Sequence, residues 1–197
     1  MNDLMNHGGG QNVTMNMTTR QIAITGVLSA IAILLGVTHL GFIPFLGTSI
    51  TIMHLPVILG AVLEGPWVGV IIGAMFGVFS LIQAYLAPAG PGDLLFRDPL
   101  VAVLPRLFIG VAAWAAYRAA RPLSEVFALG LAGAVGTLTN TALVLGMLVL
   151  RQYIPPALAW GIAITNAPLE LIAAVIITVA VIAAWKRLEY GRKGADL

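Results

Sequence analysis

Long apolar segments run through most of this sequence, and few charged residues interrupt them. Of the 197 residues, 59% are hydrophobic and 9% are charged, whereas a soluble domain has about 25% charged residues. A chain with so little polar surface is expected in a lipid bilayer. Backbone groups in a bilayer must be satisfied within the protein, so helices are the default there. We therefore expect an all-α membrane protein.

Six apolar segments are candidates for transmembrane helices of about 20 residues. They cover residues 21–38, 50–63, 66–86, 100–120, 125–150 and 157–185, and the second is short for a span. Glu64-Gly65-Pro66 predicts a tight turn between the second and third segments, because glycine permits unusual backbone angles and proline restarts a helix. The expected organisation is a disordered tail (1–19), a six-helix transmembrane domain (20–188) and a basic cytoplasmic tail (189–197).

The basic residues predict the orientation of the bundle. With six spans, seven of the ten lysines and arginines fall on one face, which the positive-inside rule assigns to the cytoplasm. Both termini are then cytoplasmic. The outer face carries loops 39–49, 87–99 and 151–156, and the first two are rich in proline and glycine, which suits lids or gates.

Strongly polar side chains inside spans are costly and mark function or a partner. Counted at 1.5 Å per residue, all of them fall in the outer half or near the midplane, and five spans contribute. This distribution predicts one cavity open to the outside. The candidate substrate-binding residues, including one from loop 87–99, are His54, Gln83, Arg97, Arg106, Asn140, Asn166 and Glu170.

Each of these side chains also has a structural interpretation. Arg106 and Glu170 could form a buried ion pair, or Arg106 could meet an anionic ligand, whose carboxylate suits its planar fork. Asn140 and Asn166 could be hydrogen-bonding glue between helices. His54 could be an interfacial histidine, and Arg97 could pair within its loop.

Several function classes lack support in the sequence. There is no cysteine, no hydrolase or metalloprotease motif and no phosphate-cradling glycine loop. We therefore expect no enzymatic activity, no metal, no cofactor, no ATP site and no nucleic-acid partner. A self-sufficient carrier would need a polar path through the inner half as well, and an intramembrane enzyme would need His54 and Glu170 within reach of each other.

The spans together resemble the substrate-binding S components of energy-coupling factor (ECF) vitamin transporters. The resemblance covers residues 19–187, nearly the whole chain. Its motifs are TRQIAITGVLSAIAILLGV, IMHLPVILGAVLEGPWVGVIIGAMFGVFS, DPLVAVLPRLFIGVAAW, TNTALVLGML and ITNAPLELIAAVIITV. The segments TIMHLPV and PLVAVLPRLFIGV are most similar to the pantothenate-type branch.

The resemblance implies a six-helix bundle in a prokaryotic cell membrane that captures one vitamin from outside. Pantothenate is the first expectation; folate, cobalamin, riboflavin or another precursor stays open. It also implies a membrane scaffold protein and two partner ATPases that hydrolyse ATP. The partner-docking surface would be the small-residue face of the first helix, at Ala23, Gly26 and Ala30.

Overall fold

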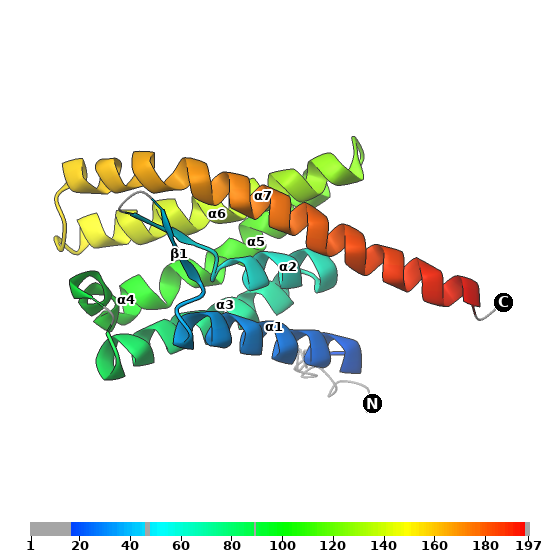
Figure 1. Cartoon of the computed structure of the whole chain (residues 1–197), viewed down its shortest axis with the longest axis horizontal. Coiled ribbons are helices and arrows are strands. Elements are labelled where there is room, and N and C mark those ends of the chain that lie inside the picture. Colours follow the sequence, from blue (N-terminus) through cyan, green and yellow to red (C-terminus); the bar gives the residue numbers. More distant parts are fainter. Residues whose placement is uncertain (1–16, 46–47, 89, 196–197) are drawn as a thin grey trace, which may run out of the picture.

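The computed structural model describes residues 17–45, 48–88 and 90–195. Most of the expected N-terminal tail lies outside these residues. The described chain is mainly helical (Figure 1), and five of its helical segments are long and apolar enough to cross a membrane. The helices are α1 (Thr19–Val37), α2 (Leu55–Glu64), α3 (Pro66–Leu86), α4 (Pro99–Ala102), α5 (Leu104–Ala120), α6 (Glu125–Leu150) and α7 (Pro156–Ala195), with the 3-10 helix η1 (Pro91–Arg97).

The second expected span is not confirmed as a transmembrane helix. The chain there forms a strand, β2 (Thr48–Thr51), and then the ten-residue helix α2. Ten residues rise about 15 Å, which is half of a hydrocarbon core of about 30 Å. Among the described residues, five long candidate spans therefore remain.

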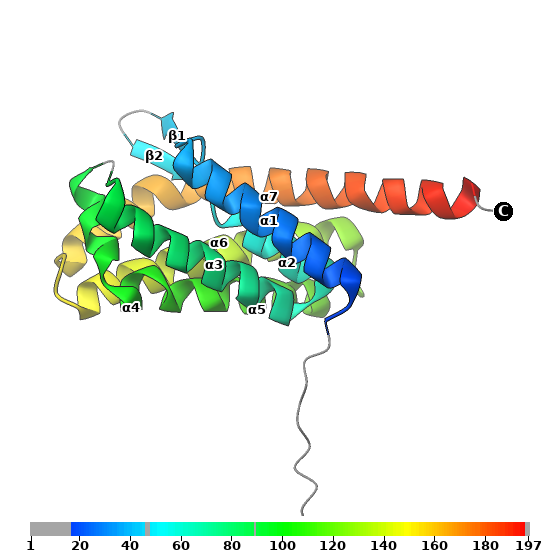
Figure 2. The ribbon, with the colours of Figure 1, turned by 90° about the horizontal axis from the view of Figure 1, so that it is seen from below.

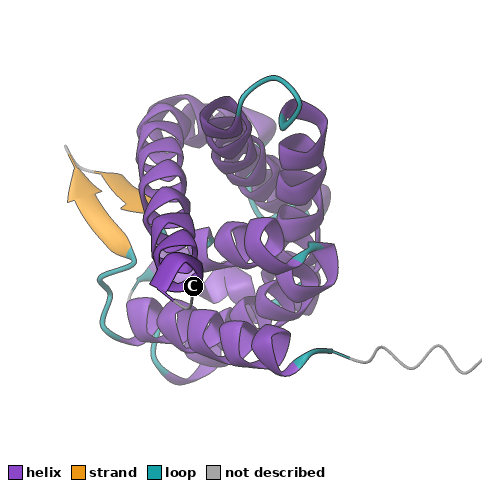
Figure 3. Cartoon of the chain, turned by 90° about the vertical axis from the view of Figure 1, so that its right-hand side faces the viewer, coloured by secondary structure: helices purple, strands orange, loops and turns teal. Residues whose placement is uncertain are grey.

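A two-stranded hairpin also departs from the expected all-α fold. Strand β1 (Phe42–Phe45) pairs antiparallel with β2, with Phe42 opposite Thr51 and Phe45 opposite Thr48. Figure 3 shows the hairpin on the flank of the helix bundle, and β2 contacts α7. Backbone pairing thus joins residues 42–45 to residues 48–51.

The predicted turn at Glu64-Gly65-Pro66 is confirmed. Gly65 has φ of 102°, a conformation that L-residues with side chains rarely adopt, and α3 begins at Pro66. Glu64 accepts a hydrogen bond from Arg20 Nε at 2.7 Å. The turn therefore lies beside the start of α1.

Two ends of the bundle can now be distinguished (Figure 1). The basic end holds the start of α1, the α2–α3 turn and the α5–α6 turn, and α7 leaves the bundle there. The hairpin end holds the hairpin, η1, α4 and the α6–α7 connection. At the basic end, Tyr117 and Lys186 both donate hydrogen bonds to Glu125, which joins α5, α6 and α7.

The last helix is longer than expected. It continues to Ala195, through the segment that the sequence assigned to a basic tail, and it projects beyond the other helices (Figure 2). Pro168 lies inside it, between Asn166 and Glu170. Proline is tolerated in membrane helices because neighbouring groups satisfy the freed backbone.

A ridge of glycines lets α3 pack directly on the backbone of its neighbours. A Cβ at Gly69 would lie 2.9 Å from Gly110 Cα, and one at Gly77 would lie 2.7 Å from Val103 Cα. A Cβ at Gly73, between them, would collide with the Arg106 carbonyl oxygen. This close approach fixes the turn of α5 that carries Arg106.

Candidate functional site

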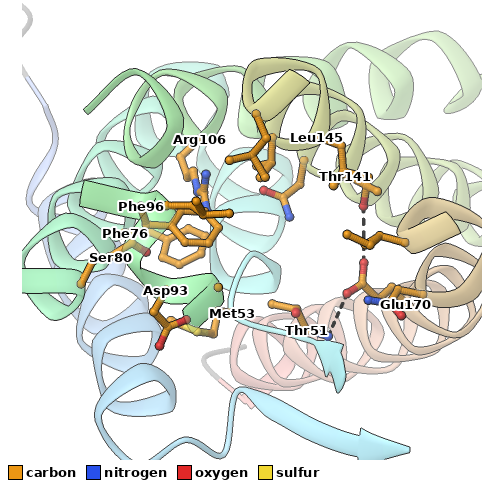
Figure 4. A pocket seen from close by; sticks show the side chains of 18 of the residues that line it. Thr51, Met53, Phe76, Ser80, Asp93, Phe96, Arg106, Thr141, Leu145 and Glu170 are labelled. Carbon is orange, nitrogen blue, oxygen red and sulfur yellow. Dashed lines mark hydrogen bonds between the residues drawn. The ribbon is translucent and has the colours of Figure 1, made fainter. Parts of the chain in front are cut away.

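A cavity of about 340 Å³ lies toward the hairpin end of the bundle (Figure 4). Side chains from η1, α3, α5, α6 and α7 form its walls, together with Thr51 and Met53 from the chain that leads into α2. His54 and the first residues of α2 are buried. The cavity therefore occupies the half of the bundle that the short α2 leaves unfilled.

Five of the seven predicted site residues line this cavity. They come from four helices and are Gln83, Arg106, Asn140, Asn166 and Glu170. The structure thus brings together polar groups that lie up to 87 positions apart in the sequence. Their role in binding stays a prediction.

His54 does not line the cavity. It is completely buried, and its Nε2 lies 2.9 Å from Thr137 Oγ1. This contact joins the start of α2 to α6 below the cavity. The depth estimated from its position in the span placed His54 near the site, but its side chain faces the core.

Arg97 does not line the cavity either. Its Nε donates to the Ala84 carbonyl oxygen at 2.9 Å, and its guanidinium stacks 5.3 Å from the centre of the Tyr85 ring. These contacts fix the end of η1 to the end of α3. These contacts are to α3 and not within loop 87–99, so they differ from the local pairing that the sequence left open.

Arg106 is the most distinctive group in the cavity. It is only 5% exposed, and its guanidinium lies between Phe76 and Phe96, 5.4 and 4.9 Å from the ring centres. Both distances suit cation–π interactions. Nη1 donates to the Val101 carbonyl oxygen at 2.6 Å, whereas Nε has no partner among the described residues. The guanidinium thus keeps hydrogen-bonding capacity that suits a planar anion such as a carboxylate.

Within the described residues, no ion pair joins Arg106 to Glu170, so that interpretation is wrong. Glu170 instead accepts hydrogen bonds from the Thr51 amide at 3.0 Å and from Thr141 Oγ1 at 3.4 Å. Figure 4 shows the two charged groups on opposite sides of the cavity. An unpaired buried charge is expensive, so a cavity that keeps both charges apart is suited to a ligand with different polar groups at its two ends.

Two amide side chains lie in the walls beside these charges. Asn140 Oδ1 is buried without a hydrogen-bond partner in the described part of the chain. Gln83 donates from Nε2 to the Gly36 carbonyl oxygen at 3.2 Å, which ties α3 to the end of α1. A buried acceptor without a partner costs stability, so Asn140 is suited to a ligand that donates a hydrogen bond.

The sequence interpretation missed several lining residues. Phe76 and Ser80 lie seven and three positions before Gln83 on α3, and Thr141 follows Asn140 on α6. Helical spacing of three, four and seven residues places such groups on one face. Extending Gln83 along its helix would have found Phe76 and Ser80, whereas Thr141, one position from Asn140, is not on that spacing, and Thr51 depends on the unexpected hairpin.

Comparison with known proteins agrees with this architecture. The model of a protein family described as "ECF transporter, substrate-specific component" matches residues 20–182. The chain belongs to this family.

Two curated relatives carry more specific names. The "Pantothenate transporter PanT" of Leuconostoc mesenteroides is 31% identical over 187 residues, which cover 84% of this chain and 92% of that protein. The "Pantothenic acid transporter PanT" of Lactococcus lactis is 31% identical over 155 residues, covering 68% of this chain and 76% of that protein. An ECF substrate-specific component is a transport protein that resides in a membrane, which accords with the five long apolar helices.

Proposed function

We propose that this chain captures pantothenate from outside a prokaryotic cell, as the S component of an ECF-type importer. The observation that carries the proposal is the buried Arg106, which lines a cavity of suitable size and whose Nε has no partner among the described residues. The names of the two relatives support the choice of vitamin.

The chemistry of pantothenate matches the distribution of polar groups in the cavity. The molecule has a carboxylate at one end, an amide in the middle and two hydroxyl groups with a branched apolar group at the other end. Arg106 pairs with the carboxylate, and Asn140 and Asn166 hydrogen-bond the amide and a hydroxyl group. Glu170, on the opposite side, accepts hydrogen bonds from hydroxyl groups, and Leu145 packs against the methyl groups.

The distribution of charge supports an orientation with the basic end in the cytoplasm. The loops and helix ends there include Arg20, Arg118, Arg121, Lys186 and Arg187, as the positive-inside rule requires. Both termini are then cytoplasmic, and the cavity faces the exterior.

Energy for release comes from partners. Ala23, Gly26 and Ala30 are exposed on α1, and a Cβ at Gly26 would meet nothing within 4 Å. A helix of the ECF membrane scaffold can approach such a face closely. Two ATPase subunits bound to that scaffold hydrolyse the ATP, so this chain needs no cofactor of its own.

Two measurements test the choice of substrate. Gently purified protein is denatured, and the released small molecules are identified by mass spectrometry; pantothenate is the expected ligand. Calorimetry with emptied protein then compares pantothenate with riboflavin and folate. Release of a different vitamin, or no heat on addition of pantothenate, would refute the assignment.

A further inference from the structure

A second polar cluster lies outside the cavity, at the hairpin end. Asp98, between η1 and α4, accepts hydrogen bonds at Oδ2 from Arg151 Nε at 2.7 Å and from Tyr153 OH at 3.1 Å. Its Oδ1 accepts from the Leu100 amide at 2.9 Å and so caps α4. The side chain of Asp98 is only 9% exposed. We call Asp98, Arg151 and Tyr153 the outer cluster.

The backbone is shaped to bring these groups together. Arg151 and Tyr153 belong to the α6–α7 connection, and Gln152 between them has φ of 59°. A non-glycine residue in this left-handed region is uncommon. The Tyr153 amide donates to the Leu148 carbonyl oxygen at 2.9 Å, and this hydrogen bond closes the end of α6 around Gln152.

In the sequence, Asp98 lies between the two residues that contact the Arg106 guanidinium on this side, Phe96 and Val101. Phe96, two positions before it, stacks on the guanidinium. Val101, three positions after it, accepts the Nη1 hydrogen bond through its carbonyl oxygen. Both contacts therefore come from the short segment 96–101, and the outer cluster fixes the middle of that segment to the α6–α7 connection.

We infer that Asp98 and Arg151 are positioning residues that set how tightly Arg106 captures an anionic ligand. The inference rests on the proposed function, because it assigns the ligand carboxylate to Arg106. Neither residue lines the cavity. They act through Phe96 and Val101, which hold the guanidinium in the cavity wall.

The Asp98→Asn variant tests this directly. Asparagine keeps an acceptor for the Leu100 amide but cannot accept from both Arg151 and Tyr153 at its second atom. We expect about a fivefold loss of pantothenate affinity, the upper range for a partly exposed ion pair. Pantothenol, which has an alcohol in place of the carboxylate, should bind as to the parent protein. Arg151→Gln should reproduce this pattern.

A matched control is available at the opposite end of the bundle. Glu64→Gln removes the ion pair between Glu64 and Arg20, whose 2.7 Å separation equals that of Asp98 and Arg151. It should change the affinity for neither pantothenate nor pantothenol. An equal loss of both ligands in Asp98→Asn would show a merely structural role for Asp98, and unchanged pantothenate affinity would show no role. Either result overturns the inference.

Hydrogen exchange in the absence of ligand separates this inference from the proposed function. Amides between Gly92 and Ala102 should exchange faster in Asp98→Asn than in the parent protein or in Glu64→Gln. If the parent protein bound no pantothenate, the proposed function would be refuted. Hydrogen exchange alone would then test whether Asp98 positions segment 92–102. Unchanged exchange in this segment would reject the positioning role.

Discussion

Replacing Arg106 by methionine is expected to weaken pantothenate binding about 100- to 1,000-fold. Nη1 is already bonded to Val101 and Nε has no partner among the described residues, so the guanidinium keeps donors for charge-assisted hydrogen bonds to the carboxylate. Such bonds contribute about 1.5–3 kcal/mol each, and truncating one partner of a buried pair costs about 2–5 kcal/mol. A loss of about 3–4 kcal/mol corresponds to this range of affinity.

Methionine is chosen because it preserves the packing around Arg106. It is unbranched and packs well against aromatic rings, so it can fill the space between Phe76 and Phe96 that the guanidinium occupies. Arg106→Lys is the complementary variant, since it keeps the charge and loses the planar fork. We expect it to lose about tenfold in affinity, less than Arg106→Met.

The assay is isothermal titration of purified protein with pantothenate and with pantothenol, alongside a thermal unfolding curve. Arg106→Met should bind pantothenol with the affinity of the parent protein, because that ligand has no carboxylate. Unchanged pantothenate affinity would remove Arg106 from the site. Equal weakening of both ligands with a lowered melting temperature would show that Arg106 only stabilises the fold.

Three further predictions follow from other parts of the chain. Gly26→Leu should leave pantothenate binding intact but abolish uptake in vesicles containing the partner subunits, because a bulky side chain blocks close helix contact; normal uptake would reject docking at α1. Gly73→Ala should destabilise the protein by about 1–3 kcal/mol, because the added Cβ collides with the Arg106 carbonyl oxygen. A Cβ added at Gly146 would meet nothing within 4 Å, so Gly146→Ala should not lower the melting temperature. The capping Leu100 amide and then the Arg151 and Tyr153 hydrogen bonds lower the pKa of Asp98. The stabilisation that ionised Asp98 gives to the folded protein is therefore complete above the unfolded pKa of about 4 and is lost as the pH falls through the lower pKa of the folded state. Hydrogen exchange of the amides in segment 92–102, corrected for intrinsic rates, should therefore stay constant from pH 8 to 5.

The long spans were predictable because their ends carry strong signals. The segments expected at 66–86 and 125–150 coincide with α3 and α6. Pro66 fixes the first boundary, and the charge of Glu125 marks the start of α6. Long apolar helices between such markers leave little choice of register, so sequence alone locates them.

The second crossing could not be predicted in the same way. Residues 50–63 are mostly apolar, and a short apolar run does not distinguish a strand from a buried helix. The outcome depends on pairing between Phe42–Phe45 and Thr48–Thr51, a tertiary interaction that composition does not reveal. Polar groups are costly in a bilayer, and this argument identified five of the side chains that line the cavity. The depth of a residue along its span could not show, however, that His54 faces the core.

The short α2 explains both the presence and the sidedness of the cavity. A full-length helix at this position would fill the space that Thr51 and Met53 now line. On the side of the basic end, Val57, Ile58 and Ile72 are completely buried and close the bundle. A ligand held by Arg106 therefore has no open route toward that end. Under the proposed function, its release would require a rearrangement that moves the packed helices, and a partner docked on the exposed face of α1 would supply the work.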